Sequence, residues 1–153
     1  MDSDDLSIQV CGTQEEMRAA QEAEMVLIEG LGNNIIQQIG NVELGKSIKI
    51  FVRNNSDEVV GGVIANVFGG WVYISLLWIE ESLRNRGYGT RLMNLVETEA
   101  TELGCQYAHV DTYSFEAKPF YERLGYKLFA TLEDYPKGHC KYFLKKRLVE
   151  ESS

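Results

Sequence analysis

The sequence has few cysteines, and their spacing does not suit cross-linking. Only three cysteines occur in 153 residues, they lie far apart, and none belongs to a CxxC pair. This odd number and wide spacing argue against both a disulfide framework and a cysteine-based zinc site. We therefore expect reduced thiols and no bound metal.

Basic residues and long apolar runs are also scarce. The chain has 15 Lys and Arg against 23 Asp and Glu, giving a net charge of −8, which opposes the many phosphate contacts of nucleic-acid binding. No apolar run approaches the roughly 18 residues that cross a bilayer, and the N-terminus MDSDDLSIQV is acidic where a secretory signal is basic. We expect a cytoplasmic protein that binds neither nucleic acid nor membrane, and whose acidic surface favours a cationic partner.

Length and composition indicate one globular domain. A chain of 153 residues with 44% hydrophobic and 25% charged residues has the size and balance of a single folded unit. The sequence shows no internal repeat, low-complexity segment or linker. We predict one domain over residues 1–150 and a frayed tail over residues 151–153.

Hydrophobic periodicity predicts a mixed α+β chain with an antiparallel meander of three strands at its centre. Thr13 and Glu16 form the capping-box pattern that starts a helix. The predicted elements are, in order, strand 6–11, helices 12–30 and 33–40, strands 47–53, 58–68 and 71–79, helix 90–104, strand 105–113, helix 116–126, and strands 126–133 and 140–148. Their order is β-α-α-β-β-β-α-β-α-β-β.

A turn rich in glycine and arginine joins the last meander strand to the next helix. Its sequence is RNRGYGT, residues 84–90. N–H groups at a helix N-terminus attract anions, glycine lets the backbone approach a ligand closely, and arginine adds forked cationic donors. We predict that this turn holds a pyrophosphate. The alternative is a tight turn with solvated arginines.

Two other phosphate-binding motifs do not match this turn. A Walker loop needs Lys and then Ser or Thr after its last glycine, but Gly89 is followed by Thr90 and Arg91. A dinucleotide fingerprint needs a third glycine, and this chain has Leu92 there.

Two segments resemble signatures of the GNAT superfamily of N-acetyltransferases. The pattern R-x-x-G-x-G at Arg84, Gly87 and Gly89 resembles its acyl-CoA-binding motif, and AKPFYERLGY resembles its A-x-x-F-Y-E-x-x-G-[FY] segment. The ending LEDYPKGHCKYFLKKRL is similar to that of small bacterial members of undefined substrate. The resemblance covers nearly the whole chain. It implies a three-layer fold with a mixed, mostly antiparallel sheet of about seven strands and helices on both faces.

The resemblance also implies an activity. Such a protein transfers an acetyl group from acetyl-CoA to a primary amine of a small molecule or lysine, by direct attack in a ternary complex. A cationic acceptor, such as a polyamine or an aminoglycoside-like compound, suits the acidic surface. The alternatives are a non-catalytic acyl-CoA-binding regulatory module and a purely structural domain. Homodimers are frequent in the superfamily, so a homodimer is one option.

The implied cofactor contacts fall into three groups. The pyrophosphate lies against N–H groups of the glycine-arginine turn, and the pantetheine arm pairs with the edge of the preceding strand. An N–H near Trp78 polarises the thioester carbonyl. Ser114 stands where many members carry an asparagine that contacts the cofactor. The implied cofactor-binding residues are Leu77, Trp78, Ile79, Arg84, Asn85, Arg86, Gly87, Tyr88, Gly89, Thr90 and Ser114.

Tyr121 is the implied proton donor to the departing thiolate, since a tyrosine is protonated at neutral pH. Its alternative role is to pack a helix against the sheet. In lysine acetyltransferases the general base is a glutamate, but its place here is Tyr73, which is not a base. The remaining candidates for the base are Glu80, Glu81, Asp111, Asp134 and His139. We rank Glu80 and His139 first.

Overall fold

The computed structural model describes residues 6–40 and 45–150. The chain divides into two compact units, one within residues 1–42 and the other within residues 43–153. The predicted tail, residues 151–153, lies outside the described residues. No helix in the described part of the chain has the length and apolar character needed to cross a membrane.

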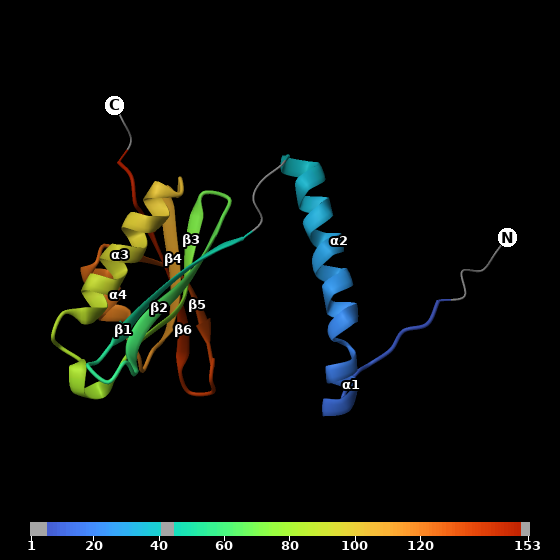
Figure 1. The fold of residues 1–153 in the computed structure, drawn as a ribbon, viewed down its shortest axis with the longest axis horizontal. Helices are drawn as coiled ribbons and strands as arrows, with labels where there is room; N and C mark the ends of the chain where they lie inside the picture. Colours follow the sequence, from blue (N-terminus) through green and yellow to red (C-terminus); the bar gives the residue numbers. More distant parts are fainter. Residues whose placement is uncertain (1–5, 41–44, 151–153) are drawn as a thin grey trace. The chain divides into compact units, whose positions relative to one another are not determined.

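The N-terminal unit contains two consecutive helices (Figure 1). Helix α1 (Gln14–Ala19) begins after Thr13, whose hydroxyl accepts a bond from the Glu16 N–H, while the Glu16 carboxylate accepts one from the Thr13 N–H. The predicted capping box is therefore confirmed. Helix α2 spans Gln21–Ile39.

The predicted break between the two N-terminal helices is wrong. Helix α2 continues through Gly30 and Gly32, and the boundary between the two helices lies at Ala20 instead, whose backbone keeps a right-handed helical conformation. A glycine inside a helix costs only about 1 kcal/mol relative to alanine. The other residues of a 19-residue helix offset that cost.

Residues 6–11 do not form the predicted first strand. They have no regular secondary structure, and Leu6, Ile8 and Val10 are almost fully exposed. A strand needs hydrogen bonds from a neighbouring strand, and an alternating sequence pattern cannot supply that partner. The described sheet consequently has six strands instead of about seven.

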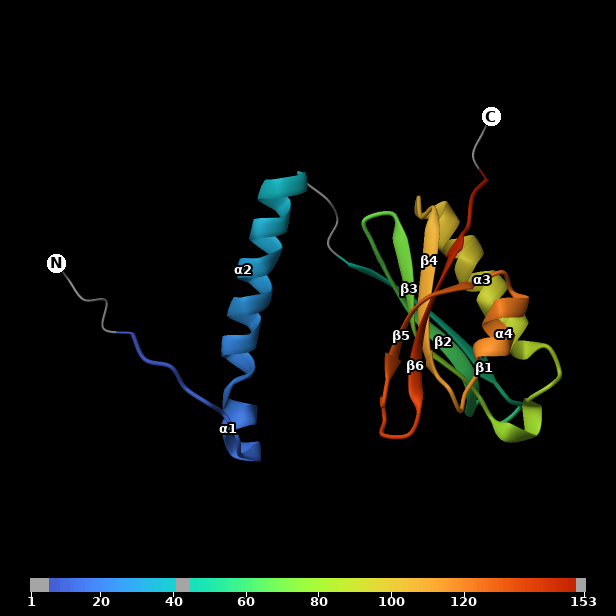
Figure 2. The ribbon, with the colours of Figure 1, turned by 180° about the vertical axis from the view of Figure 1, so that it is seen from behind.

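A mixed sheet forms the centre of the larger unit (Figures 1 and 2). Its strand order is β1-β2-β3-β4-β6-β5. Every neighbouring pair is antiparallel except β3 and β4, which are parallel. The strands are β1 (Lys46–Arg53), β2 (Val59–Phe68), β3 (Trp71–Ile79), β4 (Tyr107–Tyr113), β5 (Lys127–Glu133) and β6 (Cys140–Arg147). The predicted mixed, mostly antiparallel sheet is thus confirmed.

Helices α3 (Tyr88–Glu102) and α4 (Lys118–Arg123) lie on one face of this sheet (Figures 1 and 2). A single 3-10 turn, η1 (Glu81–Leu83), precedes α3. Alternate residues of β4 are buried on the helix side, while the residues between them lie on the opposite face. We call this second face the open face of the sheet, since neither α3 nor α4 covers it.

Strands β3 and β4 stop pairing with each other before either strand ends. Their parallel pairing runs from Trp71 and Tyr107 to Ile74 and Val110. Strand β3 then continues to Ile79, still paired with β2 on its other side. Beyond Ile74, the edge of β3 that faces β4 pairs with no strand of the described residues.

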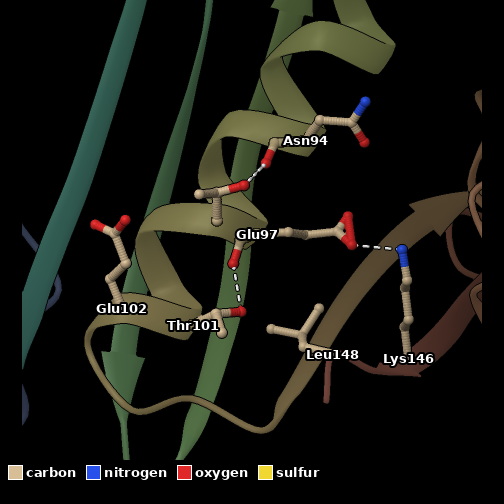
Figure 3. A pocket seen from close by; sticks show the side chains of 7 residues that line it. Asn94, Glu97, Thr101, Glu102, Lys146 and Leu148 are labelled. Carbon is tan, nitrogen blue, oxygen red and sulfur yellow. Dashed lines mark hydrogen bonds and ion pairs between the residues drawn. The ribbon is translucent and has the colours of Figure 1, made fainter. Parts of the chain in front are cut away.

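An ion pair ties α3 to β6 (Figure 3). The Lys146 ammonium binds the carboxylate of Glu97, whose side chain is only 11% exposed, and it also lies 5.6 Å from the ring centre of buried Tyr126. A cavity of about 410 Å³ adjoins this pair. Its lining residues are Asn94, Glu97, Thr98, Thr101, Glu102, Lys146 and Leu148. They lie along the C-terminal half of α3, away from the glycine-arginine turn.

We expect Lys146→Ala to lower the free energy of unfolding by about 3 kcal/mol, because it leaves the Glu97 carboxylate buried without its cation. Urea denaturation measures this loss. Lys145→Ala, at the exposed neighbouring position, is the control and should change stability by less than about 0.5 kcal/mol. Equal effects of the two substitutions would show that the ion pair contributes nothing specific.

Candidate active site

The turn between β3 and α3 presents main-chain N–H groups at its surface. Helix α3 follows Gly87, no side chain caps this end, and its first turn carries no acidic residue. The first intrahelical bond runs from the Arg91 N–H to the Gly87 carbonyl, at 3.0 Å. The N–H groups of Tyr88, Gly89 and Thr90 therefore precede the helical bonding pattern. This end of α3 is suited to an anion.

The two glycines of the turn serve different purposes. Gly87 has φ of +83°, a left-handed conformation that favours glycine, and a Cβ there would meet no atom within 4 Å. Gly89 is helical, and a Cβ there would lie 3.2 Å from Cζ of Phe120 in α4. Of these two glycines, positive φ therefore explains only Gly87. Gly89 lies against the Phe120 ring of α4, which would have to shift slightly to admit a larger residue.

The arginines also differ in their contacts. The Arg84 Nε donates to the Ile79 carbonyl at 3.0 Å, so this side chain fastens the turn to the end of β3. The Arg91 guanidinium lies 5.6 Å from the ring centre of Tyr88. Arg86 is exposed. Their positive charges lie around the uncapped end of α3.

The register of β3 shows which of its main-chain groups face β4. The Glu80 N–H donates to the Val60 carbonyl at 2.9 Å, and Trp78 stands opposite Gly62. Because hydrogen-bonded and non-bonded pairs alternate along an antiparallel ladder, the N–H of Trp78 points to β2. The N–H of Leu77 points the other way, toward β4.

Tyr121 lies on the helix-covered side of the sheet. Its side chain is 5% exposed, and its ring makes edge contacts with Phe120 and Tyr126. Burial, together with the negative charges of Glu116 and Asp111, raises the pKa of Tyr121 to about 12. The hydroxyl therefore stays protonated at neutral pH and is able to donate a proton.

His139 and Ser114 lie together where β4 ends and β6 begins. The Ser114 Oγ accepts a bond from the Cys140 N–H at 3.1 Å and lies 3.5 Å from the His139 Nδ1. Glu80 lies at the end of β3, where its carboxylate accepts a bond from the Ser82 hydroxyl at 3.3 Å. Both Glu80 and His139 are exposed. The two predicted bases are thus held by different elements.

The sequence analysis missed a polar and aromatic cluster on the open face. The Tyr73 hydroxyl donates to the Asp111 Oδ2 at 2.6 Å, and this bond adds to burial in raising the pKa of Tyr73 to about 12. His109 stacks on Tyr73 with ring centres 4.8 Å apart. Burial lowers the pKa of His109 against the opposing effect of Asp111, so its imidazole is neutral at pH 7.

One sequence signal could have revealed part of this cluster. Alternate positions of β4 carry Tyr107, His109, Asp111 and Tyr113, which share a face of the strand. Their partners across the sheet depend on strand order, which the sequence alone does not provide. Among the described residues, no three His, Cys, Asp or Glu side chains are grouped so as to hold a metal ion.

The chain matches a protein-family model and named relatives. The model is that of the Acetyltransferase (GNAT) family, and it matches residues 16–126. Blasticidin-S acetyltransferase of Streptomyces morookaense is 39% identical over 92 residues, which are 60% of this chain and 68% of that protein. An acetyltransferase of Agrobacterium fabrum is 32% identical over 102 residues, which are 67% of this chain and 74% of that protein.

Solved structures show the same fold. An acetyltransferase from Bacillus cereus aligns with a TM-score of 0.75 at 30% identity, covering 93% of this chain and 97% of the other. An aminoglycoside 6'-N-acetyltransferase complexed with coenzyme A shares the fold at 21% identity and a TM-score of 0.62, over 70% of this chain and 76% of the other. The family model spans most of the chain, so this protein belongs to the GNAT family of acetyltransferases, which use acetyl-CoA.

Proposed function

We propose that this protein transfers the acetyl group of acetyl-CoA to a primary amine of a small-molecule or lysine acceptor. The main support for this proposal is that two features lie close together in the sequence. One is the end of β3, which no longer pairs with β4, and the other is the uncapped N-terminus of α3. The first offers a strand edge to the pantetheine arm, and the second offers N–H groups to the diphosphate. The names of two relatives, a blasticidin-S acetyltransferase and an aminoglycoside 6'-N-acetyltransferase, support an amine-bearing acceptor.

Main-chain groups carry most of the proposed cofactor contacts. The N–H groups of residues 85–90 hold the diphosphate, and Arg86 adds charge to them. Leu77 supplies the N–H that polarises the thioester carbonyl, because the register directs this N–H toward β4. Ile79 extends the same edge, while the Trp78 side chain, 53% exposed, lines the open face beside it.

Side chains carry the proton transfers. The amine nitrogen attacks the thioester carbon, the carbon–sulfur bond breaks, and the departing thiolate takes a proton from Tyr121. His139 accepts the proton that the attacking nitrogen loses, since an imidazole nitrogen is able to act as a general base. Its place beside Ser114, at the end of β4, is the reason for preferring it to Glu80.

We expect His139→Gln to lower kcat by about 10²-fold, because it removes the proton acceptor. Steady-state kinetics with a saturating amine measures the loss, and the affinity for acetyl-CoA should stay unchanged. Glu80→Gln is the matched control and should leave kcat within about twofold of the wild type. The opposite result, a loss only in Glu80→Gln, would assign the base to Glu80.

A screen of amines for release of free CoA thiol tests the proposal as a whole. We expect release with at least one class of cationic primary amine. A thermal shift with acetyl-CoA should accompany it, since ligand at about 100 times its dissociation constant adds about 2.7 kcal/mol to stability. Binding without release for every amine would instead indicate a regulatory acyl-CoA-binding module. No thermal shift at all would indicate a structural domain.

A further inference from the structure

The ammonium group of Lys141 lies in a cage on the open face of the sheet. Its Nζ is 5.0 Å from the ring centre of Tyr135, 5.7 Å from that of Tyr113 and 5.6 Å from that of Phe143. It also lies 3.6 Å from the Asp111 Oδ1. We call these three rings and this carboxylate the ammonium cage.

Contacts that do not involve Lys141 hold the ammonium cage in shape. The Tyr113 ring is nearly parallel to those of Phe115 and Tyr135, at interplanar angles of 6° and 9° and centre distances of 5.3 and 5.9 Å. The second oxygen of Asp111 accepts the short bond from the Tyr73 hydroxyl. The cage should therefore keep its form when the lysine ammonium leaves.

The rings and the carboxylate of the ammonium cage are groups that attract a cation. The side chains of Lys141 and Asp111 are only 19% and 22% exposed, so the carboxylate is largely withdrawn from water. A carboxylate in such a place favours a positively charged neighbour. Aromatic ring faces attract cations, and the attraction is stronger where water is excluded. The flexible four-carbon stem of a lysine allows its ammonium to be displaced by another.

The ammonium cage lies where β3 and β4 separate. Asp111 directly follows Val110, the last residue of β4 that pairs with β3, and Tyr73 directly precedes Ile74, the last residue of β3 that pairs with β4. On the other side of β4, Tyr113 stands opposite Lys141. A ligand in the cage is thus next to the strand edge that the proposed function assigns to pantetheine.

We propose that the ammonium cage binds an amino group of the acceptor, and that Lys141 occupies the cage until the acceptor displaces it. This inference rests on the proposed function. An ammonium nitrogen has no lone pair, so the caged group is not the one that attacks the thioester. The preferred acceptor therefore carries at least two amino groups, one held as a cation and one reacting in its neutral form.

Chemical rescue tests the ammonium cage directly. Lys141→Ala should bind n-butylammonium at least about tenfold more tightly than the wild type does, seen as a concentration-dependent rise in melting temperature. No such rise in melting temperature is expected for two control variants. Lys141→Met refills the space without charge. Lys145→Ala removes a different ammonium, which lies over the Phe129 ring in the wild type. Adding Asp111→Asn to Lys141→Ala should abolish the rise. Equal responses of Lys141→Ala and Lys145→Ala would overturn the proposal.

A second measurement uses the wild type and does not depend on whether a variant folds. The kcat/KM of the wild type for diamines should exceed that for monoamines of equal chain length by at least about tenfold. Equal kcat/KM values for the two series would overturn the cage while leaving the transferase intact. Rescue by butylammonium without acetyl transfer to any amine would keep the cage and refute the proposed function.

Discussion

Thr90→Asp is expected to weaken acetyl-CoA binding by at least about tenfold, or about 1.4 kcal/mol, without lowering stability. Thr90 is exposed in the first turn of α3, which carries no acidic residue. A carboxylate there satisfies the helix N–H groups and complements the helix dipole, adding about 0.3–1 kcal/mol of stability. It also repels the diphosphate that those N–H groups are proposed to hold. Isothermal titration and urea denaturation measure the two effects separately.

The matched control for this prediction is Thr90→Asn, because asparagine has nearly the same shape as aspartate but carries no charge. It should retain acetyl-CoA affinity within about threefold of the wild type, since asparagine also accepts helix N–H bonds but does not repel phosphate. The result that identifies a diphosphate at this helix end is weaker acetyl-CoA binding together with unchanged or higher stability in Thr90→Asp. Unchanged affinity in that variant would mean that the diphosphate lies elsewhere.

Tyr121→Phe is expected to lower kcat by about 10²-fold with little change in acetyl-CoA affinity. The substitution removes a proton donor and keeps the ring contacts with Phe120 and Tyr126. Because the pKa of Tyr121 is about 12, the hydroxyl stays protonated between about pH 7 and pH 10. The ratio of wild-type to variant kcat should therefore be constant over that interval. Steady-state rates at saturating amine measure it.

Tyr126→Phe serves as the control for Tyr121→Phe. Tyr126 is equally buried, contacts the Tyr121 ring, and carries a hydroxyl beside Glu97 on α3. Its removal should leave kcat within about twofold of the wild type. Wild-type turnover in Tyr121→Phe would exclude this tyrosine from the chemistry and leave it a packing role.

Local patterns in the sequence were enough to locate the glycine-arginine turn. A glycine pair between an apolar strand and an amphipathic helix predicts a helix N-terminus, and the structure has one at Gly87. The strands of the meander and the helix with the F-Y-E segment were likewise set by periodicity and turn residues. The contact of Gly89 with Phe120 was not predictable, because Phe120 lies about thirty residues further along the chain.

Features that depend on strand pairing were beyond the sequence. The direction of the Leu77 N–H follows from the register of β3 with β2. The ammonium cage requires β6 to lie beside β4, which places Lys141 opposite Tyr113. The expected strand at residues 6–11 failed for the same reason, since alternation indicates a strand surface but does not supply a neighbour.

Comparing coenzyme A with pantetheine by calorimetric titration is the most direct test of whether residues 84–90 grip a diphosphate. Pantetheine has the thiol arm of coenzyme A but lacks its nucleotide and diphosphate. We predict at least about hundredfold tighter binding of coenzyme A to the wild type, and a much smaller advantage in Thr90→Asp. Equal affinities for the two ligands, or an advantage of coenzyme A that Thr90→Asp leaves intact, would contradict this site.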